Sequence, residues 1–455
     1  MALIAGAAAF SGSGAATLNG DELATVSAAS RSLSGLWELA RHIDGHFLPY
    51  YLFMHFWVKA GTAELWLRLP SAVAIGVAAW FLVDLGRRLH SARAGVIAGA
   101  LFAVLPSVSY YGAFARSYAF AAAAAVFSFW ALRRAVERPG GGRWVTYGVA
   151  VALVCCTHLF AVLVLPAHLA LARRGLLVRM AAALIVGGVP AAVLGLIGFG
   201  ERHAISWIPQ RGPEVWLKFP KMAAGATGTG VLLFVLALAG AAVLWTSAER
   251  RWGAALAGWL VLPPLLLLAV SHLVTPVYVD RYLFVTAPAL ALLAGVAVAA
   301  VPRFSVVAGV AVVLVAGVLA AQEHVSVREE NGRFENIPWA LRVVRAEPGD
   351  AIVYGQSQLR AGFDHYADSL MPDDVLRAGD VPLADGFGYP ERPDAGAALK
   401  GRERVWVVWR GTKQSGLEGD AVPRVGEVER AGFEVRTVKH SADLPGLTVA
   451  LFTRK

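Results

Sequence analysis

Acidic and histidine side chains gather in one stretch of this chain, Gly20 to Pro70, which lies between apolar segments. Asp21 and Glu22 stand together at the mouth of the first apolar segment, and Asp44 and His46 follow. A carboxylate beside a low-dielectric region can have its pKa tuned while water still reaches it, as a general base requires. The stretch therefore predicts proton-transfer chemistry at a membrane face. A solvated loop with ordinary surface acids is the alternative.

The composition predicts that a membrane protein positions these residues. The chain has 455 residues, of which 57% are hydrophobic and only 16% charged, and a mean hydropathy of +0.57. A soluble protein of this length would need more charge to cover its surface. The formal net charge is +9, but the basic residues form short clusters between apolar segments, which indicates membrane topology and argues against a nucleic-acid partner.

The apolar segments predict about eleven transmembrane helices. The expected spans are 2–18, 69–86, 94–109, 117–132, 144–156, 158–172, 180–199, 222–246, 253–271, 283–301 and 304–321. Alternate loops carry arginine clusters, so the positive-inside rule places those loops and the N-terminus in the cytoplasm. The other loops and the chain after residue 321 are then expected on the outer face.

From about Gln322 the composition becomes that of a soluble α/β domain. Asn336 to Ala346 has helical periodicity, and strand-like runs follow at 351–355, 405–409, 433–438 and 447–452. The predicted organisation is a transmembrane catalytic domain over 1–321, with its first extracytoplasmic loop at 19–68, and an extracytoplasmic soluble domain over 322–455. The fold class is an α-helical polytopic membrane protein with a small C-terminal α/β domain.

A series of short motifs carries a resemblance to a known family. In order they are DE after the first span, D-x-H followed by YY, LRLPSA, GRRL, ARSYA, TH before an aromatic residue, and RYL. This order resembles the GT-C superfamily of glycosyltransferases. Within it, the chain is similar to the dolichyl-phosphate-mannose-protein mannosyltransferase-like group, glycosyltransferase family 39 and its bacterial relatives. The likeness covers about Gly20 to Ala321. One departure is Phe114, which stands where an acidic residue often precedes the A-R-x-Y-A motif.

The resemblance implies an enzyme of the plasma membrane that moves a sugar from a polyprenyl-phosphate donor to an acceptor hydroxyl on the outer face, with inversion. The acceptor would be a cell-envelope glycan, lipid or protein, and the expected sugar is mannose. Arabinofuranose is the alternative within this class. A flippase or transporter of lipid-linked sugars is the alternative outside it, although the polar residues gather at one face, which suits a reaction there better than passage across the membrane. A non-catalytic scaffold is a third interpretation.

The resemblance assigns the acidic pair to catalysis. Asp21 is expected to act as general base toward the acceptor hydroxyl, and Glu22 to orient it or to hydrogen-bond the sugar. Consecutive helical residues point about 100° apart, so the two carboxylates are expected to have different roles. The alternative is that both cap the helix that begins here.

Cations at outward span ends are expected on the donor phosphate. Arg116 and Arg281 fit this role because a guanidinium can bind two phosphate oxygens as negative charge develops on the leaving group. His158, at a tight outward turn, is assigned to the same side. The alternatives are arginines that anchor helix ends and a structural histidine.

The remaining candidates belong to the acceptor or sugar side. Asp44 and His46 are expected to hold the acceptor or to order the loop, and Tyr50 and Tyr51 to stack on sugar rings or to anchor the chain at the interface. Two ligands do not make a metal site, so no metal-binding residue is predicted. No cofactor is assigned with certainty, and a divalent metal is left open.

Overall fold

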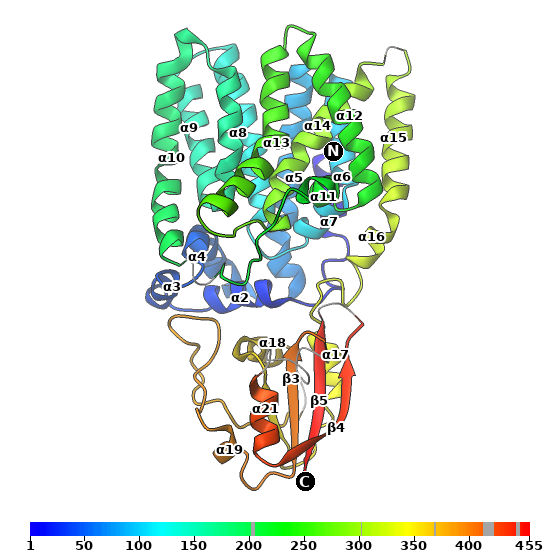
Figure 1. Cartoon of the computed structure of the whole chain (residues 1–455). Coiled ribbons are helices and arrows are strands. Elements are labelled where there is room, and N and C mark those ends of the chain that lie inside the picture. The colour runs from blue at the N-terminus through cyan, green and yellow to red at the C-terminus, as the bar shows by residue number, and fades with distance from the viewer. Residues whose placement is uncertain (202–204, 302, 368–369, 413–422, 443–445) are drawn as a thin grey trace. The chain divides into compact units, whose positions relative to one another are not determined.

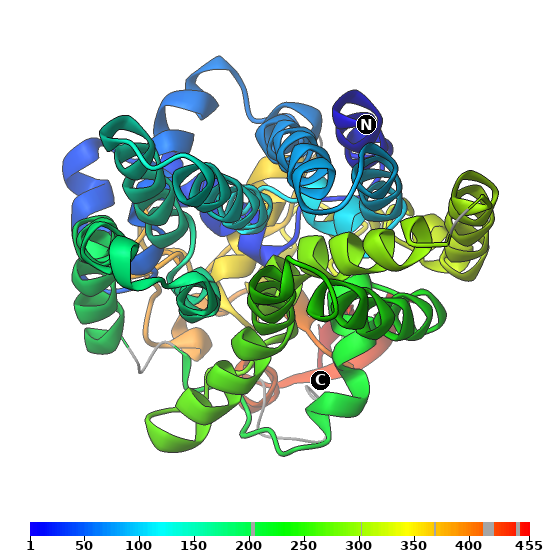
Figure 2. The same ribbon diagram turned by 90° about the horizontal axis from the view of Figure 1, so that it is seen from above.

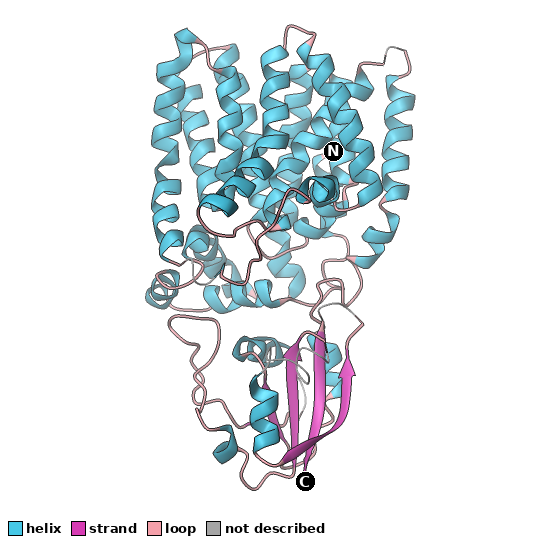
Figure 3. Ribbon diagram, in the orientation of Figure 1, coloured by secondary structure: helices cyan, strands magenta, loops and turns pink. Residues whose placement is uncertain are grey.

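The computed structural model describes residues 1–455 except 202–204, 302, 368–369, 413–422 and 443–445. Most of the described chain is helical, and one small sheet lies in its C-terminal part (Figure 3). The chain divides into two compact units. The first contains Met1–Ser13, Ala40–Phe53 and Leu65–Ser326, and the second contains Gly14–Leu39, Met54–Glu64 and Val327–Lys455. The second unit therefore combines two N-terminal segments with the C-terminal part.

The long helices of the first unit run side by side (Figure 1) and are seen nearly end-on in Figure 2. Its elements are α1 (Ala2–Phe10), η1 (Gly45–Phe47), most of α4 (Leu48–Trp57), α5 (Glu64–Leu89), α6 (Ala92–Ala103), α7 (Pro106–Gly112), α8 (Tyr118–Glu137), α9 (Gly141–Thr157), η3 (Leu159–Leu171), η4 (Arg174–Leu176), α10 (Leu177–Gly200), α11 (Val215–Ala224), α12 (Thr227–Trp245), α13 (Arg250–Leu273), η6 (Asp280–Thr286), α14 (Ala287–Ala299), α15 (Ser305–Leu319) and α16 (Ala321–Ser326).

Six described helices are long and apolar enough to cross a membrane, or seven if the bent pair α6 and α7 forms one span. The chain is therefore an integral membrane protein, as its composition predicted. The other expected spans coincide with helices that are shorter or irregular. The first becomes the nine-residue α1, and 158–172 becomes the 3₁₀ helix η3, which contains Pro166.

Helix packing in the first unit depends on small residues and on one break. The axes of α6 and α7 differ by 66°. Leu105 between them has an extended backbone because Pro106 follows it, and a residue before proline disfavours helix.

On α12, a Cβ at Gly240 would collide with the carbonyl oxygen of Leu293 on α14. Glycine thus allows these two helices to approach closely.

The second unit contains a five-stranded sheet in the order β2-β1-β3-β5-β4. Its elements are α2 (Gly20–Ala29), most of α3 (Leu33–Ala40), η2 (Val58–Ala60), α17 (Ile337–Val343), β1 (Ala351–Tyr354), η7 (Ser357–Leu359), α18 (Arg360–Tyr366), β2 (Asp373–Asp374), α19 (Ala395–Ala398), β3 (Arg404–Arg410), α21 (Pro423–Arg430), β4 (Phe433–His440) and β5 (Leu447–Arg454). Strand β1 is parallel to β2 and β3, and the β3–β5 and β5–β4 pairs are antiparallel. The predicted C-terminal strands and helix are confirmed.

Strand β3 is buried on both faces of the sheet. Alternate residues of β3 pack into two different cores, Val405 and Val407 with α19 and α21, and Trp406 and Val408 with α17 and α18. This arrangement follows from the period of two along a strand. The all-apolar run VWVVW, which carries no polar alternation, is what a strand covered on both sides requires.

Candidate active site

Asp44, Tyr51 and Arg116 form a hydrogen-bonded cluster in the first unit. Asp44 precedes η1 with a φ of 57°, and Arg116 lies in the turn between α7 and α8. The Tyr51 hydroxyl donates to Asp44 Oδ2 at 2.6 Å, while Arg116 donates to the Tyr51 oxygen at 2.5 Å and to Asp44 Oδ2 at 3.3 Å. Aspartate is one of the few residues that tolerate a left-handed backbone, which aims its carboxylate at the arginine.

The charges in this cluster are buried but compensated. Arg116 is 4% exposed, and its guanidinium carbon lies 4.3 Å from the centre of the Phe47 ring. Burial alone would raise the pKa of Asp44, but the positive charge of Arg116 and the Tyr51 hydroxyl outweigh it and hold that pKa below its usual value. Asp44 is therefore a carboxylate at neutral pH. Arg116 has five N–H donors in a planar fork, so it can hold both partners at once.

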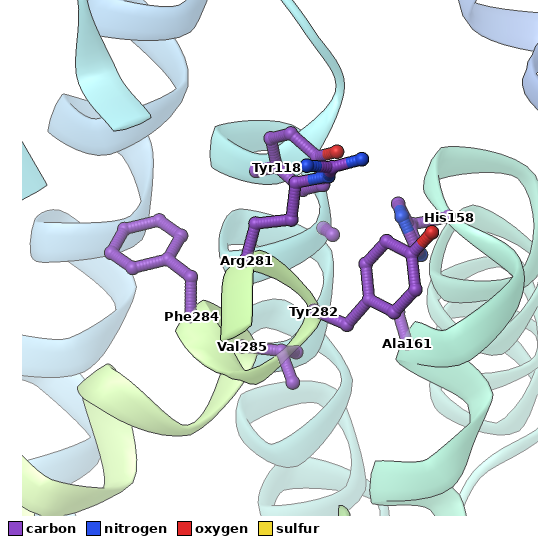
Figure 4. Close-up of a pocket in the computed structure, with 8 residues that line it drawn as sticks. Tyr118, His158, Ala161, Arg281, Tyr282, Phe284 and Val285 are labelled. Carbon is purple, nitrogen blue, oxygen red and sulfur yellow. The ribbon is translucent and has the colours of Figure 1, made fainter. Parts of the chain in front are cut away.

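His158 and Arg281 line a small pocket with Tyr118 and Tyr282 (Figure 4). Figure 4 shows the hydroxyl end of Tyr282 toward His158, and the centres of these two rings are 4.8 Å apart. The Nδ1 atom of His158 accepts the Phe160 N–H at 3.2 Å, so in the neutral ring the proton is on Nε2. Among the described residues this buried Nε2 atom has no hydrogen-bond partner. Its N–H is therefore a donor that can bind an acceptor atom of a ligand.

His46 and Tyr50 lie next to these groups. The His46 and His158 ring centres are 6.3 Å apart, and Tyr50 packs edge-on against Phe120 at 5.7 Å. Burial lowers the pKa of His46 to about 4, although the negative charge of Asp44 acts in the opposite direction. The imidazole is therefore neutral at pH 7. A neutral ring can donate or accept a hydrogen bond to a sugar hydroxyl without adding charge.

Glu201 is a further member of this region that the sequence did not single out. Its carboxylate follows the last residue of α10 and accepts the Gly45 N–H with both oxygens at 3.0 Å. Burial, aided by the charge of Asp44, raises its pKa to about 7, although the Gly45 hydrogen bond favours the charged form. An acid directly after a long apolar span was the available signal. Tyr118 and Tyr282 were also unassigned, although both stand inside the quoted ARSYA and RYL motifs.

Asp21 and Glu22 belong to the second unit. They occupy the first turn of α2, where Asp21 is partly exposed and Glu22 is fully buried. The Asn19 side chain accepts the Glu22 N–H at 3.1 Å, and the Glu22 carboxylate accepts the Asn19 N–H at 3.4 Å. Glu22 thus completes a capping box, the structural role weighed above as an alternative. Its contact with a sugar stays a prediction, as does the base role of Asp21.

The structure brings together seven of the nine predicted site residues. They are Asp44, His46, Tyr50, Tyr51, Arg116, His158 and Arg281, all in the first unit. The residues expected on the donor side and on the acceptor side are therefore neighbours. In the described chain, no three His, Cys, Asp or Glu side chains form a group that could hold a metal ion. The divalent metal left open above stays a prediction.

The chain is similar to known proteins in sequence and in fold. A family model described as dolichyl-phosphate-mannose-protein mannosyltransferase matches residues 47–197, about a third of the chain. No curated protein matches the chain. The crystal structure of ArnT from Cupriavidus metallidurans bound to undecaprenyl phosphate has a TM-score of 0.60 at 14% identity, over 99% of this chain and 96% of that one.

Two further structures are similar. The apo state of the same ArnT gives a TM-score of 0.58 at 14% identity, over 98% of this chain and 95% of that one. The oligosaccharyltransferase of Archaeoglobus fulgidus in complex with Zn and sulfate gives 0.45 at 13% identity, over 80% and 59%. The family match confirms the predicted resemblance and the class of enzyme, a glycosyltransferase. The likeness to ArnT confirms the predicted fold.

Proposed function

We propose that this glycosyltransferase moves a sugar, with mannose as the first choice, from a polyprenyl-phosphate donor to a hydroxyl of a cell-envelope acceptor. The observation that carries the proposal is the likeness over nearly the whole chain to ArnT, whose structure was determined with undecaprenyl phosphate. The family match supports mannose and includes Tyr51, Arg116 and His158. Arabinofuranose is the alternative sugar within the same class.

The reaction that we propose is a single inverting displacement. Asp21 takes the proton of the acceptor hydroxyl while the hydroxyl oxygen bonds to the anomeric carbon. The bond from that carbon to the phosphate oxygen breaks on the opposite face, and polyprenyl phosphate leaves with the electron pair. A partly exposed carboxylate at a helix start is accessible to an acceptor, which supports Asp21 over the buried Glu22 as the base.

Arg281 and His158 are proposed to bind the leaving phosphate, with Arg116 beside them. The pocket that Arg281 and His158 share is lined mainly by apolar and aromatic groups, where a charge-assisted hydrogen bond is strong. The Nε2–H of neutral His158 supplies a donor that does not repel the two arginines. Such preformed donors stabilise negative charge as it develops without reorganising during the reaction.

The acceptor or sugar is proposed to bind near Asp44, His46, Tyr50 and Tyr51. The Asp44 carboxylate already accepts from Tyr51 and Arg116, and a carboxylate has lone pairs left for a sugar hydroxyl. Aromatic rings beside these groups offer faces on which a sugar can pack.

The orientation and the domain boundaries are part of the proposal. Arginine-rich loops such as 87–93 and 133–143 would lie in the cytoplasm with the N-terminus. The loop 19–68 and the domain 322–455 would lie outside, where the chain would meet cell-envelope acceptors. The transmembrane catalytic domain would cover 1–321.

A transfer assay tests this function. Membranes carrying wild type, Asp21→Asn or the matched control Asp385→Asn, an exposed carboxylate, receive radiolabelled polyprenyl-phosphate mannose and a crude cell-envelope fraction. We expect product from wild type and the control, and about 10²- to 10⁴-fold less from Asp21→Asn, the usual loss for a general base. Full activity of Asp21→Asn would contradict the base assignment. Product only from the arabinose donor would replace the sugar and keep the reaction.

A further inference from the structure

The C-terminal part of the chain holds the segment that leads into α2. Thr17 donates from its N–H to the Glu330 carbonyl at 3.2 Å and from its hydroxyl to the Glu335 carbonyl at 2.8 Å. The Leu18 N–H donates to the Tyr366 hydroxyl at 2.8 Å. Each bond joins residues more than 300 positions apart within the second unit. The approach to α2 is therefore fixed by the C-terminal part and not by its own neighbours in sequence.

An ion pair from the C-terminal part contacts the first residue of α2. The Glu335 carboxylate accepts the Gly20 N–H at 2.8 Å, and Arg410 lies 2.9 Å from the other oxygen of the same carboxylate. The Glu335 side chain is only 12% exposed. The N–H groups of a first helical turn have no partner inside the helix, so an anionic acceptor here stabilises the helix start.

The side chains of Glu335 and Arg410 occupy the space beside the Gly20 Cα atom, so no room is left for a Cβ atom. A Cβ atom at Gly20 would lie 2.5 Å from Arg410 Nη2 and 3.2 Å from a Glu335 carboxylate oxygen. The backbone of α2 thus approaches the ion pair as closely as a residue without a side chain allows. Any side chain at this position would push the pair away from the helix.

Asp21 on α2 is within electrostatic reach of Glu335. Burial raises the pKa of the Glu335 carboxyl, and the negative charge of Asp21 raises it further, while Arg410 and the Gly20 N–H lower it. Arg410 therefore stabilises a carboxylate that stands close to a second one.

The opposite end of α2 is also held within the second unit. Arg31, just past this helix, donates to the carbonyls of Leu383 at 2.9 Å and Gly386 at 2.6 Å. In the middle, Leu23 packs so closely on α18 that a Cβ at Gly362 would lie 3.1 Å from its Cδ1 atom. The helix is thus fixed at both ends and along its buried face.

We propose that Glu335 and Arg410 are positioning residues that hold the first turn of α2, and with it Asp21, in the orientation that the transfer reaction uses. This inference rests on the proposed function, since Asp21 is the proposed base. It assigns a role in catalysis to the C-terminal domain, which contributes the two side chains. A displacement of about 1 Å in a reacting group can cost roughly 100-fold in rate. The pair of Glu335 and Arg410, which we call the clamp, therefore matters to the chemical step.

Kinetics and hydrogen exchange of the full-length protein test the clamp. The variants are Glu335→Gln, Glu335→Ala, Arg410→Gln and Arg410→Lys. The matched controls, Glu434→Gln and Arg436→Gln, change the same residue types at exposed positions of β4. Each protein is assayed with the polyprenyl-phosphate sugar that the wild type uses, and its amide exchange is followed in the peptide that covers Gly20–Ala29.

We expect the Glu335 and Arg410 variants to lower kcat about 10- to 100-fold with little change in the KM for the donor. Arg410→Lys should recover part of the rate because it keeps the charge but not the planar fork. Exchange across the first turn of α2 should accelerate in Glu335→Ala and Arg410→Gln while the melting temperature stays near that of the wild type. Gly20→Ala, which crowds the pair from the helix side, should reproduce both effects.

Two results would overturn the clamp. One is unchanged exchange in the Glu335 and Arg410 variants. The other is faster exchange in these variants together with a wild-type rate of transfer, in the case that Asp21→Asn by itself abolishes product. The contacts of Glu335 and Arg410 would then stabilise α2 without affecting catalysis. If Asp21→Asn retains full activity, Asp21 is not the base. A kcat that still falls in Glu335→Ala would then support positioning of another group of α2. An unchanged kcat in Glu335→Ala would overturn the clamp.

Discussion

At the scale of single residues, the carboxyl of Glu201 links pH to the loop that carries Asp44. Its pKa of about 7 lies above the ordinary 4.5, so folding favours its protonated form. The raised pKa contributes its full stabilisation of the fold when the pH is below the ordinary pKa of 4.5. This stabilisation is lost as the pH rises from there through about 7. The difference corresponds to at most roughly 3 kcal/mol for a carboxyl as buried as Glu201.

We therefore expect the melting temperature of the wild type in detergent to fall between pH 6 and pH 8 relative to that of Glu201→Gln, which does not titrate. Glu214→Gln is the matched control, because the Gly212 N–H lowers the pKa of Glu214 and keeps it charged throughout this range. Its melting curve should follow that of the wild type. Parallel curves for wild type and Glu201→Gln would show that Glu201 does not titrate there.

The residue types of the site could be predicted, but their contacts could not. Asp44, Tyr51 and Arg116 were each assigned alone, the first two to the acceptor and the third to the donor phosphate. Their mutual hydrogen bonds join residues 7, 65 and 72 positions apart, which no local pattern records. The contact between Glu201 and Gly45 could not be predicted for the same reason, since the two residues are 156 positions apart.

At the scale of elements, close packing of α12 on α14 depends on Gly240. We expect Gly240→Ala to lower the melting temperature clearly, because the new methyl group would meet the backbone oxygen of Leu293 and force the helices apart. Overpacking of this kind costs typically about 1–3 kcal/mol. Thermal unfolding in detergent, followed by size-exclusion chromatography, measures the effect.

The matched control for this change is Gly188→Ala on α10, where a Cβ would meet nothing within 4 Å. Alanine there should be neutral or slightly stabilising, because glycine is the poorer helix former. Equal melting temperatures for Gly240→Ala and the wild type would mean that α12 and α14 can separate without cost.

Apolar runs were enough to predict where most helices and strands lie, because burial imposes periods that are local in sequence. They could not predict how the helices end or bend. The break between α6 and α7 occurs at Pro106 inside one apolar run, and η3 is a 3₁₀ helix where an ordinary span was expected. The association of α2 with the C-terminal part of the chain could not be predicted either, since the bond from Gly20 to Glu335 spans 315 positions.

At the scale of the whole molecule, the second unit cannot form without residues 327–455. We expect a chain that ends after Ser326 to insert into membranes, because the core of the first unit lies within its own segments. Transfer should fall by about 100-fold or more, since α2 would lose the partners of Thr17, Leu18 and Gly20. The same transfer assay, normalised to protein in the membrane, checks this.

The full chain with the same affinity tag is the control for this truncation. Wild-type rates from the shortened chain would contradict a catalytic role for the C-terminal domain. An unchanged rate with a different choice of acceptor would instead assign the domain to acceptor binding.

The division of the second unit between the two ends of the chain sets an order of events during synthesis. Its first segments, up to Leu39, leave the ribosome nearly 300 residues before Val327. At about 5–20 residues per second, roughly 15 to 60 s pass after the synthesis of α2 before Glu335 exists, and roughly 20 to 75 s before Arg410 exists. During that interval the hydrophobic helices of the first unit are already being inserted. Helix α2 therefore gains the contacts with Glu335 and Arg410 only when most of the protein has been made.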